Sequence, residues 1–208
     1  MPAVDFKKTD KALYNPGAEP SLIEIPRMRF IMTDGKGDPN EEGGEFQSAV
    51  ELLYGLSYGI KMNKANPPEG YFAYSVPPLE GLWWLEGGSM DFSQKDKFFW
   101  TAMIRQPDFV DEKVFARARE DLMRKKKLDS AKARLVTWEE GLCVQVMHIG
   151  SYDSEHESIA KILAFMEERS LADDIGEMRK HHEIYLSDFR KTSPDKLRTI
   201  IRHPARKI

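Results

Sequence analysis

Five residues, MIRQP at positions 103–107, return in similar form near the end of the chain as IIRHP at positions 200–204. In each half of the chain the residue pattern predicts the same order of elements: a strand, a turn with glycine, a helix and two further strands. A five-residue echo can arise by chance, but the shared order of elements favours an internal duplication. We predict two like halves, at about 21–110 and 132–208, joined by a helix.

The predicted helices indicate how the two halves cover a sheet. Apolar residues recur at helical intervals from Phe46 to Ile60, within about 111–127 and within about 153–170. Two strand-helix-strand-strand units side by side predict an α+β fold, a curved antiparallel sheet with helices on one face and a ligand groove on the other. We expect residues 21–208 to form this single domain and residues 1–20, with their three prolines, to precede it as an arm.

The charges of the 208-residue chain nearly cancel, with 34 acidic and 31 basic residues and a formal net charge of -3. Such a balance gives no general attraction for nucleic acid or an anionic membrane, so we expect neither partner. The single cysteine excludes an intramolecular disulfide, the N-terminus lacks a signal-peptide pattern, and no apolar run approaches the ~20 residues that span a bilayer. These features predict a cytoplasmic protein, whose oligomeric state stays open.

The stretch HHEIYLSD at positions 181–188 holds the main candidate for chemistry. Side chains alternate between the two faces of a strand, so Glu183 and Tyr185 share one face while Ile184 and Leu186 share the other. If the aliphatic pair meets the helices, Glu183 faces the groove. An ionised Glu183 would complement a cationic or polarised flat ligand, whereas a desolvated one would act as a general acid or base, with Tyr185 assisting.

Aromatic residues on the other predicted strands supply walls for such a groove. Adjacent rings on a strand point to opposite faces, so some of them face the open side, although each ring alone is as well explained by core packing. The candidate ligand-binding residues are Tyr71, Phe72, Trp83, Trp84 and Trp100, with His148 at the end of the groove.

Other polar residues carry less weight. His181 and His182 are neighbours on a strand and point apart, so we predict no metal site from them and no cofactor. A structural role is the simpler interpretation of His148. Glu80 is interpreted as an ordinary strand-end charge, and the role of Glu86 stays open.

Four phrases in order, LEGLWW (79–84), MIRQPDF (103–109), HIGSY (148–152) and HEIYLSD (182–188), resemble the GyrI-like small-molecule-binding family. The resemblance implies duplicated strand-helix-strand-strand units and a ligand groove with aromatic rings and a buried Glu, which Glu183 matches. Phe189 stands where the family usually has Pro. Many relatives carry a DNA-binding domain in front, and residues 1–20 are too short to hold one.

The resemblance implies three possible functions. A subfamily of stand-alone members, the cyclopropanoid cyclopropyl hydrolases, hydrolyses cyclopropane-bearing DNA-alkylating compounds in an aromatic cage, and this chain resembles it in length and aromatic content. The first possible function is therefore a hydrolase that detoxifies flat electrophilic drugs. The second is a protein that binds and sequesters aromatic or cationic small molecules without turnover, and the third is an interaction module. We favour the hydrolase.

Overall fold

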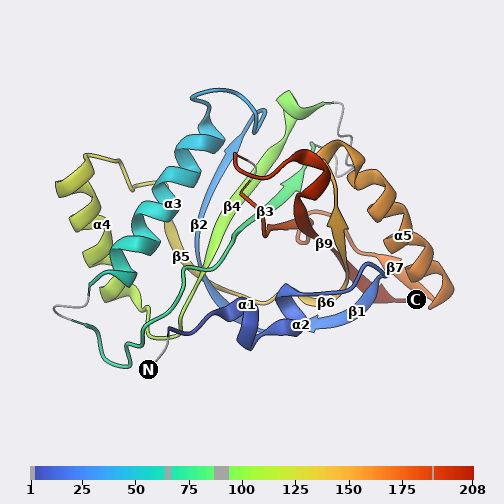
Figure 1. The fold of residues 1–208 in the computed structure, drawn as a ribbon, viewed down its shortest axis with the longest axis horizontal. Coiled ribbons are helices and arrows are strands. Elements are labelled where there is room, and N and C mark those ends of the chain that lie inside the picture. The colour runs from blue at the N-terminus through green and yellow to red at the C-terminus, as the bar shows by residue number, and fades with distance from the viewer. Residues whose placement is uncertain (1–2, 64–66, 87–93, 189) are drawn as a thin grey trace.

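The computed structural model describes residues 3–63, 67–86, 94–188 and 190–208, and within them nine strands form one antiparallel sheet (Figure 1). The strands are β1 (Ser21–Ile25), β2 (Met28–Lys36), β3 (Leu79–Trp84), β4 (Phe99–Gln106), β5 (Arg134–Trp138), β6 (Gly141–Ile149), β7 (Leu171–Asp173), β8 (His181–Tyr185) and β9 (Arg198–Lys207). The helices are α1 (Phe6–Thr9), α2 (Lys11–Tyr14), α3 (Glu45–Lys61), α4 (Glu112–Lys126) and α5 (Glu155–Glu168). An α+β fold with an antiparallel sheet is as predicted.

The strand order β1-β6-β9-β8-β3-β4-β2-β5 brings two similar units together, with β7 paired to β9 outside this path. The elements β2-α3-β3-β4 recur as β6-α5-β8-β9, and the units meet where β3 pairs with β8. The edge strands are exchanged, because β1 leads into β2 but pairs with β6, whereas β5 leads into β6 but pairs with β2. Neither unit therefore completes its sheet without the other, and their origin by duplication stays a prediction.

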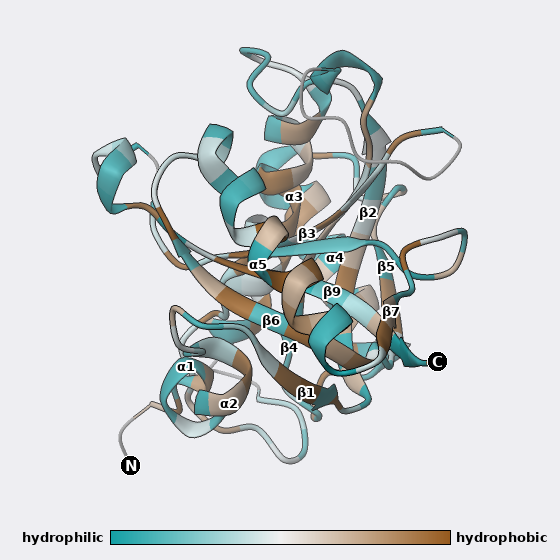
Figure 2. Cartoon of the chain, turned by 90° about the vertical axis from the view of Figure 1, so that its right-hand side faces the viewer, coloured by the Kyte–Doolittle hydropathy of each residue, from teal (hydrophilic) through white to brown (hydrophobic). Residues whose placement is uncertain are grey.

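The three long helices cover one face of the sheet. Helices α3 and α4 pack on Ile31, Trp83 and Ile104, and α5 packs on Val146 and Ile201. These strand positions share a face because Gly81, two residues before Trp83, pairs with Glu183, which pairs in turn with Ile201. In Figure 2 strand β6 is largely apolar, whereas α5 carries both apolar and hydrophilic residues, as a helix covering a sheet should.

The opposite face is covered by the N-terminal residues, so the prediction that residues 1–20 are an arm outside the fold is wrong. Phe6, Leu13 and Tyr14 are buried in the apolar cluster that also contains Ile184. Arg105 and Arg202, the arginines of the two similar five-residue stretches, both contact this N-terminal segment. Arg105 forms an ion pair with Asp10 at 2.6 Å, and Arg202 donates a hydrogen bond to the backbone carbonyl of Leu13 at 3.0 Å.

This cover corrects the predicted orientation of β8. Ile184 and Leu186 pack in the N-terminal cluster, not against the long helices, so Glu183 lies on the helix face. Alternation along the strand was sufficient to separate the two sets of side chains. It could not assign a face to each set, because both faces are covered by apolar residues. Within the described residues, no helix combines the length and apolar character needed to span a membrane.

Candidate functional site

Glu183 lies near the centre of the helix face, on a strand flanked by β3 and β9, and is only 6% exposed. Its carboxylate contacts Nε2 of His181, two residues earlier on the same face, at 3.0 Å. Opposite Glu183, Gly81 leaves room for aromatic groups: a Cβ at this position would lie 2.7 Å from Nε1 of Trp83 and 3.1 Å from the hydroxyl of Tyr185. The glycine therefore lets two aromatic side chains approach the carboxylate.

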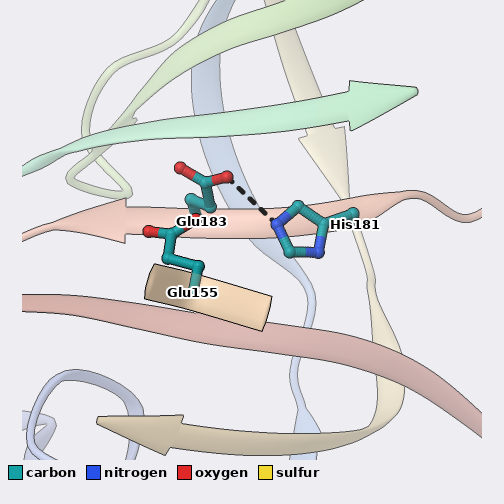
Figure 3. A group of neighbouring side chains, drawn as sticks. All are labelled: Glu155, His181 and Glu183. Atoms are coloured by element: carbon teal, nitrogen blue, oxygen red, sulfur yellow. Dashed lines mark hydrogen bonds and ion pairs between the residues drawn. The ribbon is translucent and has the colours of Figure 1, made fainter. Parts of the chain in front are cut away.

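Glu155, the first residue of α5, is the second carboxyl group of the site and is 1% exposed. Figure 3 shows the side chain of Glu155 extending toward Glu183, with His181 beside Glu183. Burial, followed by the charge and the hydrogen bond of Glu183, raises the pKa of Glu155 well above its ordinary value. Burial and the neighbouring carboxylate therefore favour the protonated form of Glu155.

His148 holds the start of α5 in this position. Its Nε2 contacts the backbone carbonyl of Ser151 at 3.0 Å and its Nδ1 contacts the hydroxyl of Ser158 at 2.9 Å. A carbonyl can only accept, so Nε2 carries the proton and Nδ1 accepts from the serine. Gly150, with φ of 148°, makes the turn between β6 and this segment. His148 is therefore a residue that positions Glu155, consistent with the structural interpretation.

Two tyrosines and one tryptophan flank the carboxyl pair. The Nε1–H group of Trp83 donates a hydrogen bond to the hydroxyl of Tyr185 at 2.9 Å, and Tyr152 packs edge-on to Tyr185 with ring centroids 6.0 Å apart. Burial, then the charges of Glu183 and Glu155, raises the pKa of Tyr185 well above its ordinary value and that of Tyr152 to about 12. Both phenols are therefore proton donors, not bases, at neutral pH.

The remaining predicted aromatic residues do not join this group. Trp100 is fully buried on the same face and packs edge-on against Phe46, while Trp84 lies on the opposite face beneath Lys180. Tyr71 and Phe72 belong to a separate cluster. Both rings pack on Phe109, and the hydroxyl of Tyr71 donates to the backbone carbonyl of Lys61. The structure thus brings together Trp83, Tyr185 and Glu183, and leaves the ligand-binding roles as predictions.

Glu183 lies away from the two hollows that the described part of the chain forms most clearly. Hollows of about 230 and 320 Å³ lie between α3 and α4 and beside the ends of β2 and β4, and neither is lined by Glu183 or Glu155. The side chain of Glu183 is 8% exposed, and Glu155 lies next to it.

Glu155 was missed at the sequence level, as was Tyr152. Glu155 falls in the polar first turn of a helix, where a carboxyl group is ordinarily solvated and interacts with the helix dipole. Its burial follows from the β6-to-α5 turn that directs it onto β8, a long-range contact that local sequence does not reveal. The motif HIGSY, which ends at Tyr152, was the one sequence feature that pointed to this segment.

A metal ion could be held by residues of this site. One ligand atom from each of Glu155, His181 and Glu183 lies within 4.8 Å of the others. His182 points to the opposite face, as alternation requires, so the adjacent histidines do not combine. In the structure Nε2 of His181 contacts Glu183 at 3.0 Å, and a donor set of two carboxylates and one imidazole is compatible with a divalent cation.

The opposite face of β8 carries a second buried polar network. His182 contacts Glu80 through Nε2 and Glu140 through Nδ1, each at 3.0 Å, and Arg202 contacts Glu140 at 3.1 Å. Both ring nitrogens face carboxylates, so His182 donates from both and is positively charged. Glu80 is 1% exposed, and its interpretation as a strand-end charge is wrong. Two acidic and two basic groups balance one another here.

A buried carboxyl pair beside aromatic rings, on an antiparallel α+β scaffold, is an arrangement suited to binding and acting on small molecules. The model of the GyrI-like small molecule binding domain matches residues 18–206, so the chain belongs to the GyrI-like family, whose domain binds small molecules. No curated protein matches the chain.

Three solved structures from Listeria innocua resemble the whole chain. A crystal structure described as an uncharacterized conserved protein is 47% identical over 98% of this chain and 100% of that one, with a TM-score of 0.92. Two others, described as hydrolases, are 45% and 46% identical, with TM-scores of 0.90 and 0.92. The similarity covers 98% and 99% of this chain, respectively, and 100% of each of theirs.

Proposed function

We propose that this protein is a hydrolase that detoxifies flat, electrophilic compounds by adding water to a strained cyclopropane ring. The observation that carries the proposal is the pair of buried carboxyl groups, Glu155 and Glu183, beside Trp83 and Tyr185. Two solved structures described as hydrolases align with 98% and 99% of this chain. Their substrates are not part of those descriptions, so the cyclopropane rests on the family resemblance and on the chemistry of the pair.

The two carboxyl groups fit complementary roles. Glu183, ionised, accepts a proton from water as the water oxygen forms a bond to a ring carbon. The carbon–carbon bond of the cyclopropane breaks, and its electron pair passes to the conjugated group of the substrate. That group then gains the proton held by Glu155. A pair of carboxyl groups whose pKa values are pushed apart by their surroundings is a general basis for such acid and base assignments.

The aromatic residues would bind and orient the substrate. A flat compound stacked between Trp83 and Tyr152 would place its strained ring over Glu183, and strain in that ring already lowers the barrier to opening. Tyr185 would add a hydrogen bond from its phenol, which the raised pKa keeps protonated. Because the ligand would contact Trp83, we expect its binding to change the tryptophan fluorescence.

The test is to incubate the purified protein with a cyclopropane-bearing alkylating compound and to measure the hydrated product by mass spectrometry. We expect Glu183→Gln to lower the turnover number by ~10²–10⁴-fold, the usual contribution of a general base, while binding of a neutral aromatic ligand is retained. Glu157→Gln is the matched control, because Glu157 lies in the first turn of α5 but is exposed.

The alternative function is binding and sequestration without turnover, because a buried carboxylate beside aromatic rings also complements a cationic aromatic ligand. Stoichiometric loss of the free compound with no hydrated product would support sequestration and reject hydrolysis. If Glu183→Gln alters neither product formation nor the affinity for cationic ligands, the role given to this carboxylate is wrong.

A further inference from the structure

The carboxyl pair of the site has no basic partner. Among the described residues, no lysine or arginine forms an ion pair with Glu155 or Glu183. On the opposite face of β8, by contrast, Glu140 contacts Arg202 at 3.1 Å. Oε1 of Glu155, a residue that is 1% exposed, has no hydrogen-bond partner in the described part of the chain. A buried carboxyl oxygen without a partner is costly, so a positively charged ligand here would supply what the fold omits.

The three groups that meet here match the ligand set of a transition metal (Figure 3). One ligand atom from each of Glu155, His181 and Glu183 lies within 4.8 Å of the others, and Nε2 of His181 is 3.0 Å from Oε1 of Glu183. Bonds of about 2.0–2.2 Å from zinc to oxygen and nitrogen place the ligand atoms of a tetrahedral site about 3.4 Å apart. The observed atoms therefore need to approach by at most about 1.4 Å, a change that the torsions of a glutamate side chain can supply.

His181 is supported in the way that a metal-binding histidine is. A metal on Nε2 requires the proton on Nδ1, and metal-binding histidines ordinarily donate that second N–H group to a fixed acceptor. Nδ1 of His181 lies 2.9 Å from Nε2 of His203 on β9, whose Nδ1 lies 3.0 Å from Oδ2 of Asp173 on β7. Both imidazoles are buried, at 0% and 3% exposure. These contacts orient Nε2 of His181 toward Glu183 and provide outer support for a metal site.

We propose that Glu155, His181 and Glu183 form a binding site for one divalent transition-metal cation, of which zinc is the best match. An imidazole nitrogen favours zinc over magnesium and calcium, and two carboxylate oxygens balance its two positive charges. Three protein ligands leave the fourth position of a tetrahedral site for water. Binding releases any proton that the carboxyl pair holds, because a carboxyl group coordinates in its deprotonated form.

Calorimetric titration of the metal-free full chain with zinc chloride tests the site without any substrate. We expect one equivalent of zinc to bind, and cobalt(II), a spectroscopic substitute for zinc, to give the visible absorption of a tetrahedral complex. In a zinc-soaked crystal, the anomalous scattering peak should lie about 2.0–2.2 Å from Nε2 of His181 and from one oxygen of each glutamate. No heat of zinc binding and no visible cobalt spectrum, or a peak elsewhere, would overturn the site.

Glu155→Gln should weaken zinc binding by at least about 100-fold, because loss of a residue that merely supports a metal ligand already costs about 10–100-fold. The variant removes a buried charge that has no basic partner, so we expect it to fold, with thermal unfolding as the check. The matched controls are His156→Asn and Glu157→Gln, exposed neighbours in the same helix turn that can bind zinc adventitiously. If the controls lose zinc and Glu155→Gln retains it, the site is rejected.

Asp173→Asn tests the outer support with a change near the surface, since the side chain of Asp173 is 29% exposed. We expect zinc affinity to fall by about tenfold, because the contact that orients His203, and through it His181, is weakened. Asp174→Asn is the control, because Asp174 has a similar side-chain exposure of 33% but contacts Arg179 instead of a histidine. Equal zinc affinities of the two variants would contradict the support assigned to Asp173.

The effect of zinc on turnover rests on the proposed function, whereas zinc binding does not. Coordination occupies the oxygens with which Glu155 and Glu183 would exchange protons during hydrolysis. Saturating zinc should therefore lower the turnover number by at least about tenfold, and excess chelator should restore it. If zinc binds at these residues and turnover is unchanged, the acid and base roles are wrong and the cation site stands. If the metal-free protein forms no hydrated product, the proposed function fails, and calorimetry and the cobalt spectrum still decide the cation site.

Discussion

Replacement of Glu140 by glutamine should destabilise the protein markedly at neutral pH. Burial alone would raise the pKa of Glu140, but the charges and hydrogen bonds of His182 and Arg202 outweigh it and lower the pKa from 4.5 to about 2. Because one pKa unit corresponds to about 1.4 kcal/mol, this lowering of the pKa contributes roughly 3–4 kcal/mol of folding free energy. Loss of one partner from a buried ion pair costs a similar amount, roughly 3–5 kcal/mol, since His182 and Arg202 are left uncompensated.

The sign of the pH dependence follows from the direction of each shift. The pKa of Glu140 is lowered, so its contribution is complete above pH 4.5 and is lost as the pH falls toward 2. Burial lowers the pKa of His182, but Glu140 and Glu80 raise it above 6.5 on balance, so its contribution is complete below pH 6.5 and is lost as the pH rises through the raised value. Stability should therefore be greatest between these limits.

Urea unfolding at several pH values measures this prediction. At pH 6 the Glu140→Gln variant should lose about 3 kcal/mol of unfolding free energy, or roughly 6–12 °C in Tm, and the acid limb of the pH profile should flatten between pH 4.5 and 2. Glu139→Gln is the matched control, because the neighbouring carboxylate is exposed. A loss below about 0.5 kcal/mol, or an unchanged acid limb, would refute the assignment of Glu140 as an ion-paired anchor.

Two further predictions concern the aromatic side of the site. Gly81→Ala should destabilise the fold by about 1–3 kcal/mol and displace the rings, because its Cβ would lie 2.7 Å from Trp83; Gly176→Ala, whose Cβ meets nothing within 4 Å, should have no such effect in thermal unfolding and tryptophan fluorescence. Trp83→Phe removes the hydrogen bond to Tyr185 and should cost about 1 kcal/mol in urea unfolding, with Trp84→Phe as the control. Equal effects in each matched pair would contradict the proposed packing around Gly81.

The echoed stretches predicted the order of elements but not how the halves are joined. MIRQP and IIRHP lie on β4 and β9, the strands next to the central pair β3 and β8. The alternation of their residues directs Ile104 and Ile201 to the helices and both arginines to the N-terminal segment. The exchange of β1 and β5 between halves could not be predicted, because edge pairing depends on contacts more than 100 residues apart in sequence.

The sequence predicted the part of the candidate site that lies on β8. Period-two alternation correctly grouped Glu183 with Tyr185 and His181, and separated them from His182. It could not supply Glu155, which comes from a helix, or the choice of face, which depends on the cover provided by Phe6, Leu13 and Tyr14. The groove was expected where the sheet was thought to be open, and both faces of the sheet are covered.

Buried charges are compensated on one face of β8 and not on the other. This difference distinguishes a structural network from a candidate functional site. On the N-terminal face, two carboxylates contact one imidazolium and one guanidinium, so the network is neutral and satisfied. On the helix face, Glu155 and Glu183 lie together, and Oε1 of Glu155 has no hydrogen-bond partner among the described residues. Negative charge that the fold leaves uncompensated must be met by a proton or a ligand. An uncompensated carboxyl pair does not stabilise the fold. We therefore expect binding and chemistry on the helix face of β8.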